Sequence, residues 1–170
     1  MRRPGADQDD FRAFVTASAG QLYRSACLLT GGDTHLAEDL VQEAFGRVYQ
    51  RWSTVVHLDN PVGYAQTTLV NTFISTRRKR SNHERPGLVA VDGPAADPDP
   101  ALRLSLLAAL RRLTPTDRAV LVLRYWEDRS VEDTAAVLNL SPGAVRSRSG
   151  RALARIRDIL GADFAVLAHR

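Results

Sequence analysis

Apolar residues recur every three or four positions along two blocks of the chain, and this spacing places them on one face of a helix. In the first block the spacing predicts helices over about 9–30, 34–52 and 61–79. In the second block it predicts helices over about 101–113, 115–126, 131–138 and 142–160. Neither block shows the alternating pattern that is typical of strands, so we expect an all-α protein.

Capping residues at the predicted helix ends support these boundaries. Gly31-Gly32 is expected to end the first helix, because glycine reaches left-handed backbone angles at little cost. A polar cap residue followed by proline is a strong helix start. It occurs at Asn60-Pro61, Thr114-Pro115 and Ser141-Pro142.

Residues 81–100 interrupt the helical pattern. This stretch is rich in proline, glycine and aspartate, a composition that breaks both helices and strands. We therefore predict two small helical domains, residues 1–80 with three helices and 101–170 with four, joined by a flexible linker over 81–100.

Composition limits the classes of function. The net charge is +4 and the pI about 9.8, which fits a polyanionic partner without proving one. Cys27 is the only cysteine and stands among apolar residues, so we expect a small buried side chain and no disulfide. The four histidines lack metal-ligand spacing, and no nucleophile–base pair or phosphate loop is evident. We expect no metal, no cofactor and no enzymatic activity. Without a signal peptide or an apolar run long enough for a membrane span, the protein is expected in the cytoplasm.

The strongest functional pattern lies between Ser130 and Arg157. A short helix, a turn at Asn139-Leu140 and a capped second helix form a helix-turn-helix pattern, in which Ala135 and Ala136 are small enough for a close helix crossing. Arginines separated by small residues allow the second helix to lie in a major groove and to reach phosphates and guanine edges. The alternative is a solvated basic face of a plain helical bundle. The predicted DNA-contacting residues are Arg146, Ser147, Arg148, Arg151 and Arg155.

Two weaker patterns lie in the first block. A polar stripe on the third helix, Thr68, Asn71, Thr72 and Ser75, leads into the basic cluster Arg77-Arg78-Lys79-Arg80 and suits a DNA backbone. The same pattern is also expected of an ordinary solvated helix end. On the second helix, Asp39, Gln42 and Glu43 form an acidic patch with Glu38, which suggests a basic protein partner or a plain solvated face.

Two of these segments carry a resemblance to a known family. The run Ala37–Phe45, AEDLVQEAF, looks like the polymerase-binding segment of bacterial sigma factors. The run Leu140–Arg148, LSPGAVRSR, looks like the entry to the recognition helix of their C-terminal domain. The chain resembles the small extracytoplasmic-function (ECF) sigma factors from about residue 10 to residue 160, with sigma regions 2 and 4 as its two domains.

The resemblance implies a role for each pattern. Asp39, Gln42 and Glu43 would contact core RNA polymerase. Asn71, Ser75, Arg77, Arg78 and Arg80 would act at the minus-ten promoter element, and the arginine-bearing helix would read the minus-thirty-five element. The linker would enter the polymerase channel, and an anti-sigma factor is a further partner of the family. Many relatives carry aspartate where Ser75 stands, which leaves the minus-ten preference open.

Two other functions remain open on the residues alone. A stand-alone helix-turn-helix regulator would bind duplex DNA but would not need the acidic patch. A helical protein-interaction adaptor would use the basic faces to bind acidic proteins. Binding to core polymerase and promoter-directed transcription separate these alternatives from a sigma factor.

Overall fold

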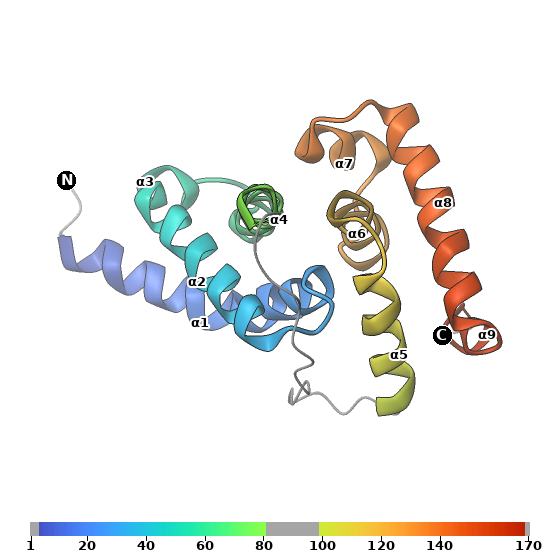
Figure 1. Cartoon of the computed structure of the whole chain (residues 1–170). Coiled ribbons are helices and arrows are strands. Elements are labelled where there is room, and N and C mark those ends of the chain that lie inside the picture. The colour runs from blue at the N-terminus through green and yellow to red at the C-terminus, as the bar shows by residue number, and fades with distance from the viewer. Residues whose placement is uncertain (1–3, 81–98, 169–170) are drawn as a thin grey trace.

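The computed structural model describes residues 4–80 and 99–168, and every regular element within them is a helix (Figure 1). The N-terminal module comprises α1 (Pro4–Leu29), α2 (Thr34–Gln50), α3 (Trp52–Val55) and α4 (Pro61–Arg80). The C-terminal module comprises α5 (Pro100–Arg111), α6 (Pro115–Leu121), the π-helical turn η1 (Val122–Trp126), α7 (Val131–Leu138), α8 (Pro142–Leu160) and α9 (Asp163–Ala168). The all-α prediction is confirmed. Of the linker predicted over residues 81–100, residues 81–98 lie outside the described residues, whereas Asp99 caps α5 and Pro100 begins it.

Side-chain caps fix the starts of α2, α6, α7 and α8, and the sequence predicts those of α6 and α8. The Asp33 carboxylate accepts a hydrogen bond from the backbone N–H of Leu36 at 3.0 Å and opens α2. The hydroxyls of Thr114, Ser130 and Ser141 accept equivalent bonds at the starts of α6, α7 and α8. Each of these bonds satisfies a backbone donor that would otherwise have no partner within the helix.

The core of the N-terminal module lies where α1, α2 and α4 meet. Leu22 and Leu29 of α1, Val48 of α2 and Leu69 of α4 are fully buried there. Cys27 is 3% exposed and packs in the same cluster, and burial raises the pKa of its thiol. The prediction of a small, buried cysteine side chain is therefore confirmed.

Three local features differ from the predicted helices. The second predicted helix ends at Gln50, and Trp52 begins the separate short helix α3. The predicted helix over 115–126 changes at Val122 into the π-helical turn η1. After it, Asp128 takes a left-handed backbone angle, with φ of 53°, which redirects the chain into α7. The helix α9 follows a turn at Gly161 and was not predicted.

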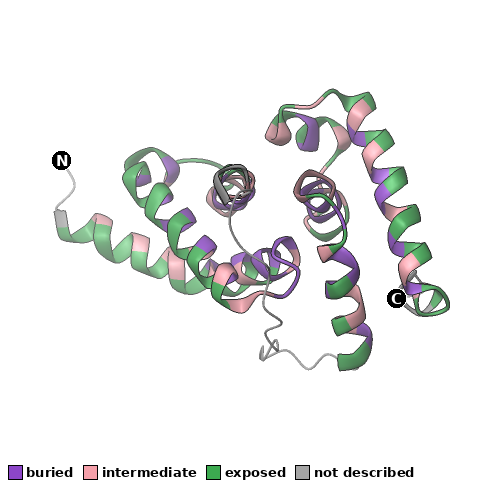
Figure 2. Cartoon of the chain, viewed as in Figure 1, coloured by how far each residue is buried: buried purple, intermediate pink, exposed green. Residues whose placement is uncertain are grey.

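The two modules pack against each other, a contact that no pattern in the sequence predicted. Ala119, Val122 and Leu123 belong to the same buried cluster as the core of the N-terminal module. Figure 2 shows buried positions on the facing sides of both modules. The spacing of these three residues gives α6 and η1 a second apolar face, and burying apolar surface of this kind is the main favourable term in association.

No helix among residues 4–80 and 99–168 combines the length and the apolar character that crossing a membrane requires.

Candidate polymerase and nucleic-acid interfaces

The helix α8 separates an apolar face from a basic face. It packs against α5, α6 and α7, and four of its five arginines are exposed. This is the division that the sequence predicts. The buried set is Val145, Ser149, Ala152, Ile156 and Leu160, and the exposed set is Arg146, Ser147, Gly150, Arg151 and Arg155.

Arg148 differs from the other predicted DNA contacts because it is half-buried and already paired. Its Nη1 donates to Oδ1 of Asp117 in α6 at 2.7 Å. Arg146 instead lies 3.5 Å from Glu132 of α7 in a pair whose side chains are both largely exposed. The guanidinium of Arg148 therefore has one fixed direction, whereas that of Arg146 is held only weakly.

The turn before α8 sets the crossing of α7 and α8. Asn139 ends α7 in the left-handed conformation, with φ of 54°, and the N–H of Leu140 donates to the carbonyl of Ala135 at 2.9 Å. Ala135 is buried beside Val145, as predicted, but Ala136 is exposed. The expectation that Ala136 lies at the crossing is wrong, because Thr134 takes the second buried position of α7.

The polar stripe on α4 is narrower than predicted. Asn71 and Ser75 are exposed, but Thr72 is buried and its hydroxyl donates to the carbonyl of Thr68 at 2.7 Å. The hydroxyl of Thr68 in turn donates to the carbonyl of Tyr64. Thr72 is fully buried, whereas Thr68 is half-buried. The interpretation of Thr72 as part of a DNA-facing stripe is therefore wrong.

The basic end of α4 is described only in part. The Arg77 guanidinium carbon lies 5.8 Å from the centre of the Phe73 ring, an arrangement that attracts a cation to an aromatic face. The side chains of Arg78 and Arg80 lie outside the described ones.

The acidic patch on α2 is exposed. Asp39, Gln42 and Glu43 all lie on the solvent side of the helix, opposite the buried face that carries Leu40 and Ala44. Glu43 pairs with Arg47, one turn further along, at 2.7 Å. Part of the patch's negative charge is therefore offset within the helix.

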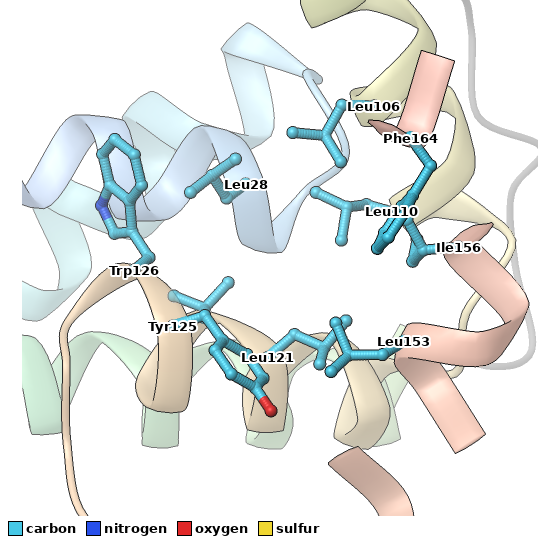
Figure 3. Close-up of a pocket in the computed structure, with 10 residues that line it drawn as sticks. Leu28, Leu106, Leu110, Leu121, Tyr125, Trp126, Leu153, Ile156 and Phe164 are labelled. Atoms are coloured by element: carbon cyan, nitrogen blue, oxygen red, sulfur yellow. The ribbon is translucent and has the colours of Figure 1, made fainter. Parts of the chain in front are cut away.

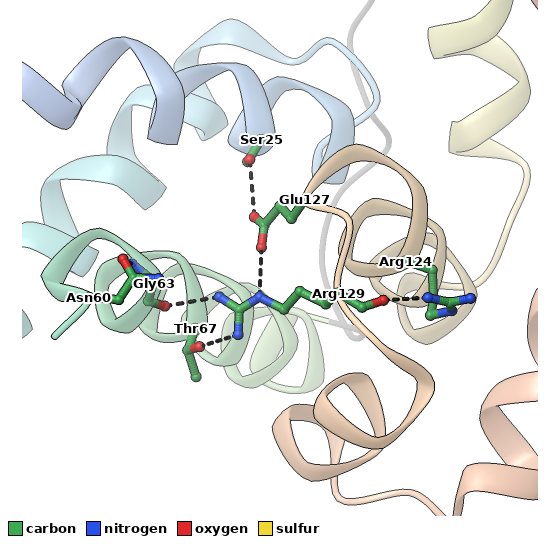
Figure 4. Close-up of polar contacts among 7 residues, drawn as sticks. All are labelled: Ser25, Asn60, Gly63, Thr67, Arg124, Glu127 and Arg129. Carbon is green, nitrogen blue, oxygen red and sulfur yellow. Dashed lines mark hydrogen bonds and ion pairs between the residues drawn. The ribbon is translucent and has the colours of Figure 1, made fainter.

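Contacts between the modules involve a polar group that sequence reasoning missed. Arg129, in the turn after η1, donates to the Thr67 hydroxyl and to the Gly63 carbonyl, both at 2.9 Å (Figure 4). Thr67 lies four residues before Asn71, which would place it on the same face of α4. The four-residue spacing between Thr67 and Asn71 is the only signal in the sequence for a role of Thr67.

A second polar contact buries Arg118 of α6. Its Nη1 donates to the carbonyl of Leu29 at the end of α1 at 2.7 Å, and its Nη2 to that of Leu113. Its guanidinium also lies 5.7 Å from the ring centre of Phe73. Burial, together with repulsion from Arg77 and Arg111, lowers the pKa of Arg118 to about 10, so it remains a cation at neutral pH.

An apolar groove of about 460 Å³ also lies where the modules meet (Figure 3). Leu28 of α1 lines one side, and residues of α5, α6, η1, α8 and α9 line the rest. Tyr125 and Trp126 at its margin are each about half exposed.

The comparisons with known proteins agree with this arrangement. The family model for Sigma-70 region 2 matches residues 9–83, and the model for Sigma-70 region 4 matches residues 103–156. The RNA polymerase sigma-E factor of Streptomyces coelicolor is 37% identical over 153 residues, which cover 89% of this chain and 86% of that protein. The ECF RNA polymerase sigma factor SigE of Mycolicibacterium smegmatis is 35% identical over 158 residues, covering 86% of this chain and 60% of that protein.

A solved structure shares the fold. The sigma factor RpoE of Bartonella quintana, in complex with the anti-sigma factor NepR, superposes with a TM-score of 0.71 at 23% identity, covering 91% of this chain and 98% of that one.

Two packed helical modules, one carrying a helix-turn-helix with an exposed arginine face, define a DNA-binding transcription factor. The two family models match the chain in the order region 2, then region 4, and this identifies the family. The chain belongs to the ECF RNA polymerase sigma factors, and it directs core RNA polymerase to promoters.

Proposed function

We propose that three separate surfaces of the chain share the task of directing core polymerase to promoters. The acidic patch of α2, formed by Asp39, Gln42 and Glu43, binds a basic surface of core polymerase. The stripe of α4 that contains Asn71 and Ser75, together with Arg77, Arg78 and Arg80, binds the minus-ten element. The exposed face of α8 reads the minus-thirty-five element.

The observation that carries the proposal is the division of α8. Its apolar residues are buried, while Arg146, Arg151 and Arg155 face outward beside small Ser147 and Gly150. Small residues allow the helix to approach the base pairs closely, and arginines reach phosphate oxygens or the O6 and N7 atoms of guanine. Arg148, held by Asp117, would contribute a guanidinium that is already oriented.

The proposed surfaces of α2 and α4 lie on the same module. This placement suits polymerase binding and strand opening, which act together. Unstacking bases costs a few kcal/mol per step, on the order of what a protein recovers by holding the opened strand. Exposed Asn71 and Ser75 offer hydrogen bonds to such a strand. The chemistry of RNA synthesis is that of the polymerase, so none of these residues has to be catalytic.

Two weak DNA contacts on one chain strengthen each other. Once polymerase or one promoter element is bound, the second contact forms at a high effective concentration, set by the length of the linker. The B. quintana relative is solved with an anti-sigma factor. We propose a partner of this kind for the present chain as well.

Run-off transcription with core polymerase on genomic fragments, followed by mapping of start sites, tests this division. Arg151→Ala should lower promoter output by roughly tenfold, since one groove-reading arginine contributes about 1–3 kcal/mol. The matched control is Arg157→Ala in the last turn of the same helix, because the Arg157 guanidinium lies over the Phe164 ring of α9, beyond the five proposed DNA contacts. Equal output from both variants would refute groove reading by α8.

The same protein preparations decide between the other functions. Tight binding to duplex DNA without binding to core polymerase would favour a stand-alone regulator. Binding to neither, with capture of acidic proteins, would favour an interaction adaptor.

A further inference from the structure

Two arginines of the C-terminal module lie at the end of α1. Arg118 of α6 donates to the carbonyl of Leu29, the last residue of α1. The side chain of Arg111, in the last turn of α5, crosses the turn that follows, because a Cβ added at Gly31 would lie only 2.0 Å from the Arg111 Cγ. Gly31 has a φ of 65°, so glycine meets both the backbone angle and the close approach. The two arginines therefore contact the same short segment of the N-terminal module.

A third arginine joins this group from α4. The guanidinium carbons of Arg77 and Arg118 lie 5.8 Å and 5.7 Å from the centre of the Phe73 ring, so the two cations share one aromatic side chain. Arg111 completes the group, since repulsion from Arg77 and Arg111 contributes to the lowered pKa of Arg118. We call Arg77, Arg111 and Arg118 the arginine cluster.

The arginine cluster has no matching negative charge among residues 4–80 and 99–168. None of the ion pairs described there includes a member of the cluster. The carbonyls of Leu29 and Leu113, with the negative end of the α1 dipole, partly offset the charge of Arg118. The same residues provide no carbonyl or carboxylate partner for Arg77 or Arg111. Like charges held together at a partly buried position are costly unless an anion joins them.

Unused donors show where such an anion would bind. The Nε–H groups of Arg77 and Arg118 are both buried and have no hydrogen-bond partner. A buried donor without a partner is destabilising, and more so on a charged group. Arg118 is 3% exposed and lies deepest, whereas Arg77 and Arg111 are half-buried and form the solvent side of the cluster. An anion entering between these two would also reach the Nε–H of Arg118.

We propose that the arginine cluster is a binding site for a small phosphate-bearing anion. The anion accepts hydrogen bonds from Arg77, Arg111 and the Nε–H of Arg118. Phosphate fits better than carboxylate, because its oxygens point in several directions and can accept from guanidinium groups on three helices, whereas a planar carboxylate pairs best with one. A nucleic-acid backbone fits less well, because its phosphates are flanked by two sugars and Arg118 lies deep. The site goes beyond the proposed function, although Arg77 belongs to both.

Binding is measured by isothermal titration calorimetry of the full chain with inorganic pyrophosphate, at about 0.15 M salt to screen surface charges. We expect saturable binding at one site per chain. Arg111→Gln should weaken it by about tenfold or more, the loss typical of one hydrogen bond to a charged group. Glutamine keeps the Cβ and Cγ atoms that pack at Gly31. The matched control is the exposed Arg112→Gln, which removes the same charge and should change the affinity by no more than about twofold.

Thermal unfolding separates an anion site from a purely structural role of Arg111. Pyrophosphate at about one hundred times its Kd should raise the Tm of the wild type by about 5–10 °C, because it binds only the folded chain. Arg111→Gln should lose most of this rise. Without any anion, Arg111→Gln should melt no lower than Arg112→Gln, because it relieves repulsion within the cluster. A purely structural role predicts a lower Tm in both conditions. Arg77→Gln, on the other module, keeps the test valid if Arg111→Gln fails to fold.

Further titrations identify the source of the phosphate group. Binding of ADP as tight as that of pyrophosphate, or tighter, would assign the site to a nucleoside diphosphate, whereas weaker binding would assign it to the free anion. Both results support the site. Acetate at the same concentration should not displace pyrophosphate, and equal displacement would contradict the preference for phosphate.

Binding to a fluorescein-labelled single-stranded DNA separates this site from the proposed minus-ten surface. Arg111 is not among the proposed DNA contacts, so Arg111→Gln and Arg112→Gln should bind the DNA equally. Weaker DNA binding by Arg111→Gln alone would assign the cluster to the DNA backbone and overturn the small-anion site. Wild-type protein that binds no pyrophosphate, or variants Arg77→Gln and Arg111→Gln that bind it as tightly as the wild type, would overturn it as well. Neither of these last two results would affect the DNA role of α4.

Discussion

Arg148 of α8 and Asp117 of α6 form an ion pair, with Nη1 and Oδ1 2.7 Å apart. Asp117 lies in the first turn of α6, where its N–H is bound by the Thr114 cap, so the carboxylate is anchored to a rigid helix start. An arginine held in this way points in one direction and is prepared to select one base or phosphate. Asp117 is therefore a positioning residue for the proposed reading face.

Replacing Asp117 should change DNA selectivity more than stability. Asp117→Asn should destabilise the fold by less than about 1 kcal/mol, since the pair is partly exposed. It should also tighten binding to non-promoter duplex DNA by about fivefold at low salt, because a negative charge beside the groove is lost. Fluorescence anisotropy on promoter and non-promoter duplexes measures the ratio. Asp158→Asn, also on α8, is the control, and an equal change there would show that charge alone is responsible.

The Glu43–Arg47 ion pair on α2 permits a test in which two sets of substitutions should change the affinity for core polymerase in opposite directions. Charge reversal at Asp39 and Glu43 together should weaken binding to core polymerase by at least about tenfold, since like charges facing each other cost several kcal/mol. Arg47→Ala should instead strengthen binding by about twofold, because it frees the Glu43 carboxylate. Surface plasmon resonance on immobilised core polymerase measures both. If Arg47→Ala weakened binding, Glu43 would not be the contacting group.

Arg118 should be a large contributor to stability. It is 3% exposed and donates to the carbonyls of Leu29 and Leu113, which would both lose a buried partner in Arg118→Met. We expect the free energy of unfolding of the full chain to fall by about 2–4 kcal/mol, measured by urea denaturation. The exposed Arg112→Met should change it by less than about 0.5 kcal/mol. A change at Arg118 no larger than that would contradict the role.

Glu127 should make the stability of the fold depend on pH. Burial raises the pKa of its carboxyl, although Arg129 and the Ser25 hydroxyl oppose this by lowering it. Because the pKa of the Glu127 carboxyl is higher in the folded chain than in an unfolded one, the folded chain binds the proton more tightly. The associated stability is complete below the ordinary glutamate pKa of about 4.5 and is lost as the pH rises through the raised value.

The free energy of unfolding of the wild type should therefore rise relative to that of Glu127→Gln as the pH falls from 7 toward 4.5. Taking the difference between the two proteins removes the effect of all other carboxylates. Parallel pH profiles would show that Glu127 has an ordinary pKa.

The sequence predicted best those features that local chemistry determines. The caps at Thr114 and Ser141 lie at the predicted positions, because a cap requires only a side chain and a backbone donor three residues away. The two faces of α8 followed from its 3.6-residue period. The acidic patch on α2 was placed on the exposed side for the same reason.

What the sequence could not predict depends on partners distant along the chain. Thr72 fits a polar stripe by spacing, yet it is buried where α4 packs in the core. In the sequence nothing distinguishes Arg148 from the neighbouring arginines. Only the fold brings it next to Asp117, which stands 31 residues earlier in the chain. Packing of Ala119, Val122 and Leu123 against the other module was also missed, since an apolar residue carries no sign of which neighbour it will meet.

The outward placement of α8 has a consequence for how the free protein searches for its targets. In Figure 1, α8 lies on the side of the C-terminal module away from the N-terminal module. The exposed arginines of α8 therefore stay accessible to duplex DNA while the two modules are packed together. The unbound factor is thus expected to sample chromosomal DNA weakly and reversibly through one helix, with a salt dependence set by those few arginines. Such a search would concentrate it near upstream elements before any polymerase arrives.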